Sequence, residues 1–192
     1  MSLGYWETLI AITGDGTALT AAARASLLQG AGGKQGLYTL PPNTLRVGDI
    51  LNLKASGRIS CVITTPGTAR FDLSADVAGT AFFDTLAMNL NVVAKTNVPW
   101  ILEAEGTVRV IGNAGNIFWQ GMWESEAVIG SPLPTVGGSG NFVVPYNTAP
   151  VAGTNFDMSL VHILDFNFTQ TVATGSCQLH EFALSRKTAT GF

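Results

Sequence analysis

The stretch ILNLKASGRISC, residues 50–61, decides the fold class of this chain. Apolar or small side chains alternate along it with polar ones: Leu51, Leu53, Ala55, Gly57, Ile59 and Cys61 against Asn52, Lys54, Ser56, Arg58 and Ser60. Successive side chains of a strand point to opposite faces of a sheet. A period of two sustained over the whole stretch therefore predicts one long, half-buried strand.

The same alternation recurs outside this stretch. It runs through residues 102–110 and through residues 160–169, where Leu160, His162, Leu164, Phe166 and Phe168 share one face. The other face of 160–169 begins with Val161 and Ile163, so the first half of that strand is expected to be buried on both sides. Further strands are predicted over 5–13, 37–40, 69–77, 83–94, 117–128 and 178–185, with Leu86, Met88, Leu90 and Val92 on one face of 83–94.

Two segments are read differently. Residues 17–28 (TALTAAARASLL) fit a short helix or an extended strand equally well. Residues 130–153 (GSPLPTVGGSGNFVVPYNTAPVAG) are dense in Gly, Pro, Ser and Asn, which predicts a long surface loop without regular structure. The strand pattern as a whole predicts one all-β domain, a two-sheet antiparallel β-sandwich over residues 1–192.

The composition is poor in charge. Charged residues make up 12% of the chain, hydrophobic residues 46%, and the mean hydropathy is +0.30. A surface with so few charges tends to associate, so we expect an oligomer or a component of a larger assembly; the alternative is a monomer with a large core. The net charge of −3 comes with no cluster of Lys or Arg, which argues against nucleic-acid binding.

The chain begins without a signal-peptide pattern and has no apolar stretch of membrane-spanning length, so neither secretion nor membrane insertion is expected. Cys61 and Cys177 lie on predicted strands, far apart in sequence and outside metal-ligand spacing. We interpret them as two buried free thiols in a reducing cytosol, with a disulfide as the alternative.

Four glutamates are the candidates for catalysis. Glu103 and Glu105 share one strand face, and Glu124 and Glu126 share another. Paired carboxylates across a cleft, with Trp100, Trp119 and Trp123 as a sugar platform, would suit a β-sandwich glycosidase. The interpretation we favour is that each pair marks a solvated face, because Thr107 and Arg109 continue the polar side of the first strand.

The remaining candidate groups favour structural roles. His162 and His180 lie among apolar neighbours in the pattern and are expected to be satisfied core residues. Asp72, Asp76 and Asp84 could suggest calcium, but they lack the short ligand-dense loop that such a site needs. Motifs of serine hydrolases, metalloproteases and phosphate loops are missing, so we expect no enzyme activity, no cofactor and no metal.

One phrase points to a family. LYTLPPNTL, residues 37–45, followed by VGDILNL, residues 47–53, resembles the T-I-P-A-N-x-L-x-x-G-D-x-L-x-I phrase of jelly-roll virion proteins of tailed bacteriophages. The segments 100–110, 120–123 and 178–184 also resemble that group. The resemblance implies a TNF/C1q-like jelly roll that forms homotrimers, located in the virion after assembly in the host cytoplasm. It implies contacts with the major capsid protein or other virion proteins.

Three functions follow as hypotheses. The first is a capsid decoration or cement protein; the second is a tail-fibre or other glycan- or receptor-binding trimer; the third is a sandwich hydrolase that uses the glutamates. For the first, contacts are expected from an N-terminal arm of about residues 1–7 and from the loop 130–153. The interface residues expected there are Tyr5, Trp6, Leu133, Phe142 and Tyr146.

Overall fold

The computed structural model describes residues 5–28, 37–62, 67–76, 79–127, 140–153 and 156–188. The described residues contain strands and turns but no helix, which confirms the all-β class. Their strands are β1 (Trp6–Ala11), β2 (Arg24–Ser26), β3 (Tyr38–Leu40), β4 (Ile50–Cys61), β5 (Thr68–Ala75), β6 (Ala81–Asp84), β7 (Met88–Asn89), β8 (Lys95–Val110), β9 (Asn116–Ser125), β10 (Asn141–Val144), β11 (Ala152–Gly153), β12 (His162–Gln170) and β13 (Ser176–Lys187).

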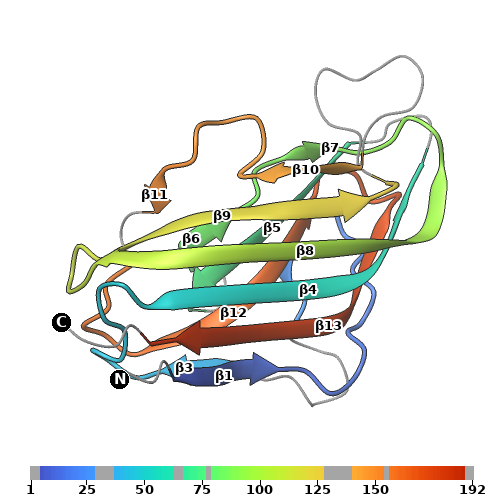
Figure 1. Ribbon diagram of the computed structural model, residues 1–192. Helices are drawn as coiled ribbons and strands as arrows, with labels where there is room; N and C mark the ends of the chain where they lie inside the picture. The colour runs from blue at the N-terminus through green and yellow to red at the C-terminus, as the bar shows by residue number, and fades with distance from the viewer. Residues whose placement is uncertain are drawn as a thin grey trace.

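The strands form two antiparallel sheets that face each other (Figure 1). The larger sheet has the order β1-β13-β4-β8-β9-β10, with β11 also paired to β9. The smaller has the order β2-β12-β5-β6, with β3 also paired to β12 and β7 to β5. When β2 with β3, and β6 with β7, each count as one strand position, and β9, β10 and β11 are left out of the count as an extension of the larger sheet beyond β8, the orders are 1-8-3-6 and 2-7-4-5. This is the strand order of a jelly roll.

The long strand that decides the fold class is confirmed. β4 covers residues 50–61, and Leu51, Leu53, Ala55 and Ile59 are buried on its inward face. The chain turns before this strand at two residues with positive φ angles, Asn43 at 56° and Gly48 at 87°. Aromatic rings join the sheets: Phe71 of β5 lies 4.8 Å from Trp100 of β8 and 4.7 Å from Trp123 of β9, measured between ring centroids.

In the segment 130–153, the described residues 140–153 are not a loop without regular structure. β10 and β11 lie within this segment, and both pair with β9 at the margin of the larger sheet. Val144 of β10 is fully buried and Phe142 and Tyr146 pack against the core, whereas Val143 and Val151 are exposed. The prediction failed because Gly and Pro at the flanks obscured a short strand at Asn141–Val144.

Three other predictions need correction or completion. Residues 17–28 are extended, with β2 inside them, so the strand alternative is correct. The segment 83–94 is not one strand: it breaks after β6, where Leu86 adopts φ 62°, and resumes as β7. The expected N-terminal arm of about residues 1–7 also overlaps β1, which begins at Trp6.

β12 is buried on both faces, but in its middle rather than at its start. Val161 and Ile163 are exposed, whereas Asp165 and Asn167 are buried on the outward side of the strand. Apolar periodicity predicted the reverse. It could not show that a polar network covers the outward face of the smaller sheet.

Candidate functional site

The two strands that carry the four glutamates are neighbours, as a glycosidase would require. β8 pairs with β9 so that Glu103 lies opposite Met122, Glu105 opposite Gln120 and Glu124 opposite Ile101. All four glutamates are exposed. Glu103 and Glu126, whose side chains are 61% and 69% exposed, form ion pairs with Lys54 and Lys95 at 3.6 Å and 3.0 Å.

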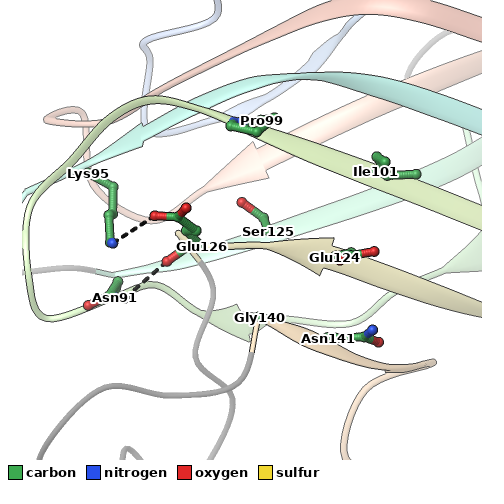
Figure 2. Close-up of a pocket in the computed structure, with 9 residues that line it drawn as sticks. All are labelled: Asn91, Lys95, Pro99, Ile101, Glu124, Ser125, Glu126, Gly140 and Asn141. Atoms are coloured by element: carbon green, nitrogen blue, oxygen red, sulfur yellow. Dashed lines mark hydrogen bonds and ion pairs between the residues drawn. The ribbon is translucent and has the colours of Figure 1, made fainter.

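A hollow of about 580 Å³ lies beside Glu124 and Glu126, at the end of β9 (Figure 2). Its lining includes the apolar side chains of Pro99 and Ile101 and the polar side chains of Asn91, Lys95 and Asn141. The Glu126 carboxylate turns towards Lys95, and the amide of Asn91 donates to the Glu126 carbonyl at 3.0 Å. The Glu124 carboxylate points away from that pair (Figure 2).

This arrangement lacks the features of a retaining or inverting carboxylate pair. Such a pair places one carboxyl group in an apolar setting where it stays protonated, opposite a second group across the sugar ring. Here the carboxylates lie on the open outward face of a sheet, and the ones nearest the hollow diverge. The interpretation of the glutamate pairs as solvated strand faces is confirmed.

The three tryptophans proposed as a sugar platform lie in the core. Trp100, Trp119 and Trp123 are 1%, 2% and 0% exposed. Trp100 and Trp123 stack with ring centroids 5.2 Å apart, and Trp119 packs on Phe83 at 5.1 Å. The alternative in which they form a sugar platform is therefore wrong, because these tryptophans lie on the inward side of β8 and β9, opposite to the glutamates.

The three aspartates considered for calcium have separate partners. Asp72 accepts hydrogen bonds from the guanidinium of Arg24, Asp84 accepts from Arg70, and Asp76 contacts His162 at 3.1 Å. Their carboxylates therefore belong to three different contacts. Within the described segments, no three acidic, histidine or cysteine side chains lie close enough together to hold a metal ion.

Asp72 and its partner Arg24 belong to a polar network that the sequence analysis missed. On the outward side of the smaller sheet, Arg24, Asp72, Asn167 and Asp165 form a largely buried polar layer. The Asn167 amide donates to Asp72 at 3.2 Å, and the hydroxyl of Ser26 donates to Asp165 at 2.5 Å. Burial raises the pKa of Asp165. The sequence signal was the set of polar residues that alternate with apolar ones along β5 and β12, and the sequence analysis assigned no network to them.

The two histidines differ. His162 is a satisfied core residue, as expected: it is 8% exposed, and its Nδ1 and Nε2 lie 3.1 Å from Asp76 and 2.6 Å from the Asp157 carbonyl. His180 is not in the core. A register shift between Leu179 and Glu181 breaks the alternation of β13, and His180 pairs with Asp15 at 2.8 Å on a partly exposed surface.

Of the expected interface residues, two are exposed and two pack against the core. Tyr5 and Trp6 are exposed, at 62% and 57%. Phe142 and Tyr146 instead pack against each other, with ring centroids 4.9 Å apart, and against the core. Leu133 lies outside the described residues.

Cys61 and Cys177 are buried free thiols, as expected, and burial raises the pKa of both.

What remains on the surface is a set of large apolar side chains. It comprises Tyr5, Trp6, Val47, Val93, Ile101, Val110, Ile111, Met122, Val143, Val151, Leu160, Val161 and Ile163. Single exposed apolar residues need no explanation, but residues that gather in one place indicate an interaction surface. In the described residues, no helix is long and apolar enough to cross a membrane.

The chain matches no protein-family model and no curated protein. Among solved structures, it is similar to the CBM2 module of the evolved Dit of Lactobacillus casei BL23 phage J-1. The identity is 9%, the TM-score is 0.30, and the alignment covers 98% of this chain and 99% of the other. A TM-score this low supports no conclusion about fold or function.

Proposed function

We propose that this chain is a non-enzymatic structural protein of a tailed-phage particle, acting as a decoration protein on the capsid. The observation that carries the proposal is the placement of its side chains. The carboxylates that could serve catalysis lie on an open, ion-paired face, while aromatic and aliphatic side chains such as Trp6 and Leu160 are exposed to solvent. Exposed apolar surface is typical of proteins that work in assemblies.

Two further points support the proposal. The phrase across residues 37–53 resembles phage jelly-roll virion proteins, and the strands other than β9, β10 and β11 follow the jelly-roll orders 1-8-3-6 and 2-7-4-5. A decoration protein of this kind would bind the major capsid protein, and the resemblance implies a homotrimer. Both remain part of the proposal.

The test is binding to purified phage heads. The recombinant chain is mixed with heads that lack it, and sedimentation followed by protein quantification gives the number of copies bound per head. Saturable binding at a symmetric copy number, and the presence of the chain in native heads, would support the proposal.

If the chain is missing from native heads and instead binds host cells or glycans, it is a tail-fibre or receptor-binding module. Glycan hydrolysis that is lost in Glu124→Gln or Glu126→Gln would contradict a non-enzymatic role.

A further inference from the structure

Seven of the exposed apolar residues lie at one end of the sandwich. They are Tyr5, Trp6, Val47, Val110, Ile111, Leu160 and Val161, and we call this surface the apolar end. The start of β1, the β3–β4 connection, the β8–β9 hairpin and the start of β12 meet there (Figure 1). These residues come from four separate parts of the chain, so it is the jelly-roll connections that bring them to the same end.

Backbone hydrogen bonds join the segments of the apolar end into one surface. The Gly48 amide donates to the Val108 carbonyl at 2.8 Å, the Asn43 amide donates to Met158 at 2.8 Å, and the Met158 amide donates to Gly112 at 3.0 Å. The guanidinium of Arg186, near the end of β13, donates to the Thr44 carbonyl at 2.9 Å. The apolar side chains are therefore carried on connected loops rather than on independent ones.

We infer that the apolar end is a surface on which a second copy of this chain docks. Its size is the first argument. Full residue areas of about 150–250 Å² and the exposed fractions place the seven residues together at on the order of 650 Å². A standard stable interface buries about 800 Å² on each partner, whereas the largest apolar patch of a typical monomer is about 300–600 Å².

The charge of the apolar end is the second argument, because it favours a second copy of this chain over a strongly charged partner. In and beside the segments of the apolar end, four acidic residues (Glu7, Asp49, Asp76 and Asp157) are balanced by four basic ones (Arg46, Arg109, Arg186 and Lys187). Glu7 pairs with Arg186 at 3.1 Å, and the Asp76 carboxylate contacts the ring of His162 at 3.1 Å. The cation of Lys187 lies over the ring of Trp6, 5.8 Å from its centroid. An end that is balanced in charge meets its own copy without like-charge repulsion. Interfaces between identical chains are also the more apolar class.

The experiment measures the mass of the purified full chain by size-exclusion chromatography with light scattering, over a range of micromolar concentrations. Ile111→Asp with Leu160→Asp places two charges on the apolar end, at residues that are 49% and 55% exposed. Val93→Asp is the matched control, because Val93 is 57% exposed and lies near the start of β8, at the opposite end of the sandwich. The expected result is an oligomer for the wild type and the control, with at least a tenfold weaker self-association for the double variant.

Two outcomes would overturn the inference: a monomeric wild type throughout the range, or a double variant that associates as the wild type does. Ile111→Ser with Leu160→Ser removes the same two apolar side chains without adding charge. If its circular dichroism spectrum matches that of the wild type, weaker self-association of this variant is due to the lost surface and not to lost folding. The inference rests on the proposed function only in assuming that the chain works in an assembly, and head binding distinguishes the two. An oligomer that does not bind heads refutes decoration and leaves the inference standing. A double variant that stays oligomeric but no longer binds heads assigns the apolar end to a different virion protein and refutes the inference.

Discussion

At the scale of single residues, Gly106 shows how closely the larger sheet is packed. Gly106 of β8 lies opposite Trp119 of β9, and a Cβ atom at Gly106 would lie 2.4 Å from the Trp119 ring. Trp119 itself is held by Phe82 and Phe83 of the other sheet, with ring centroids 6.2 Å and 5.1 Å away. The indole therefore has little room to move, and the glycine is required by the width of this ring.

Gly106→Ala is expected to lower the free energy of unfolding by about 1–3 kcal/mol, the usual cost of overpacking a core. Urea unfolding followed by tryptophan fluorescence measures it. Gly14→Ala is the control, because a Cβ atom at Gly14 has nothing within 4 Å and the variant should be close to neutral. Equal stability of the two variants would contradict this account of Trp119.

Asp165 is the residue whose ionisation should affect stability. It is fully buried, and burial raises its pKa in the folded chain above the unfolded value of about 3.9. A carboxyl group with a raised pKa binds its proton more tightly when folded. Its contribution to stability is complete below the unfolded pKa and is lost as the pH rises through the folded pKa.

Asp165→Asn removes this ionisation while it keeps an oxygen that can accept from Ser26. The variant is expected to gain stability relative to the wild type as the pH rises from 4 to 7. Urea unfolding of both proteins at the two pH values measures the change. A stability difference that does not vary with pH would mean that Asp165 has the same pKa in both states.

At the scale of elements, β2 is held to the smaller sheet by backbone pairing with β12 and by a side-chain contact with β5. It has three residues and pairs only with β12. Arg24 of β2 reaches across to Asp72 of β5, with Nε 3.0 Å from the carboxylate, and Asp72 is 1% exposed. A buried carboxylate of this kind depends on its cation, because removal of one partner leaves an unpaired charge inside the protein.

Arg24→Ala should therefore destabilise the chain by about 2–4 kcal/mol, somewhat less than a fully buried pair because Arg24 is partly exposed. Amide exchange at Ala25 and Leu27 should accelerate at the same time, as β2 opens. Arg70→Ala is the matched control: its pair with Asp84 is more exposed, and its loss should cost about 0–1 kcal/mol. If both variants cost the same, the buried pair has no special role in holding β2.

At the scale of the whole molecule, the jelly-roll order places the core, the polar faces and the apolar end in different parts of the sandwich. One shared core joins the two sheets through Phe71, Trp100 and Trp123. Most of the polar and ionic pairs lie on the outward faces, and the apolar end collects exposed Tyr5, Trp6 and Leu160. The self-association test belongs to this scale, because no single strand carries the surface that it examines.

Alternation alone predicted much of the fold. β4 agrees with the expected strand at both ends, and the solvated glutamates follow from the same period of two. It failed where the backbone departs from regular geometry. The shift at Leu179/Glu181 moved His180 to the surface, and the positive φ of Leu86 divided a predicted strand. Side-chain periodicity carries no signal for such breaks.

The amino-acid sequence was enough to predict the all-β class, the long strand at 50–61 and the burial of both cysteines. Each of these depends on local chemistry: the period of two and the apolar neighbours of each cysteine. Only the tertiary structure decided that Asp165 and Asn167 are buried, that residues 141–144 complete a sheet, and that Trp6, Ile111 and Leu160 share one end. These depend on which distant strands become neighbours, and that is set by the connections of the jelly roll rather than by any single stretch.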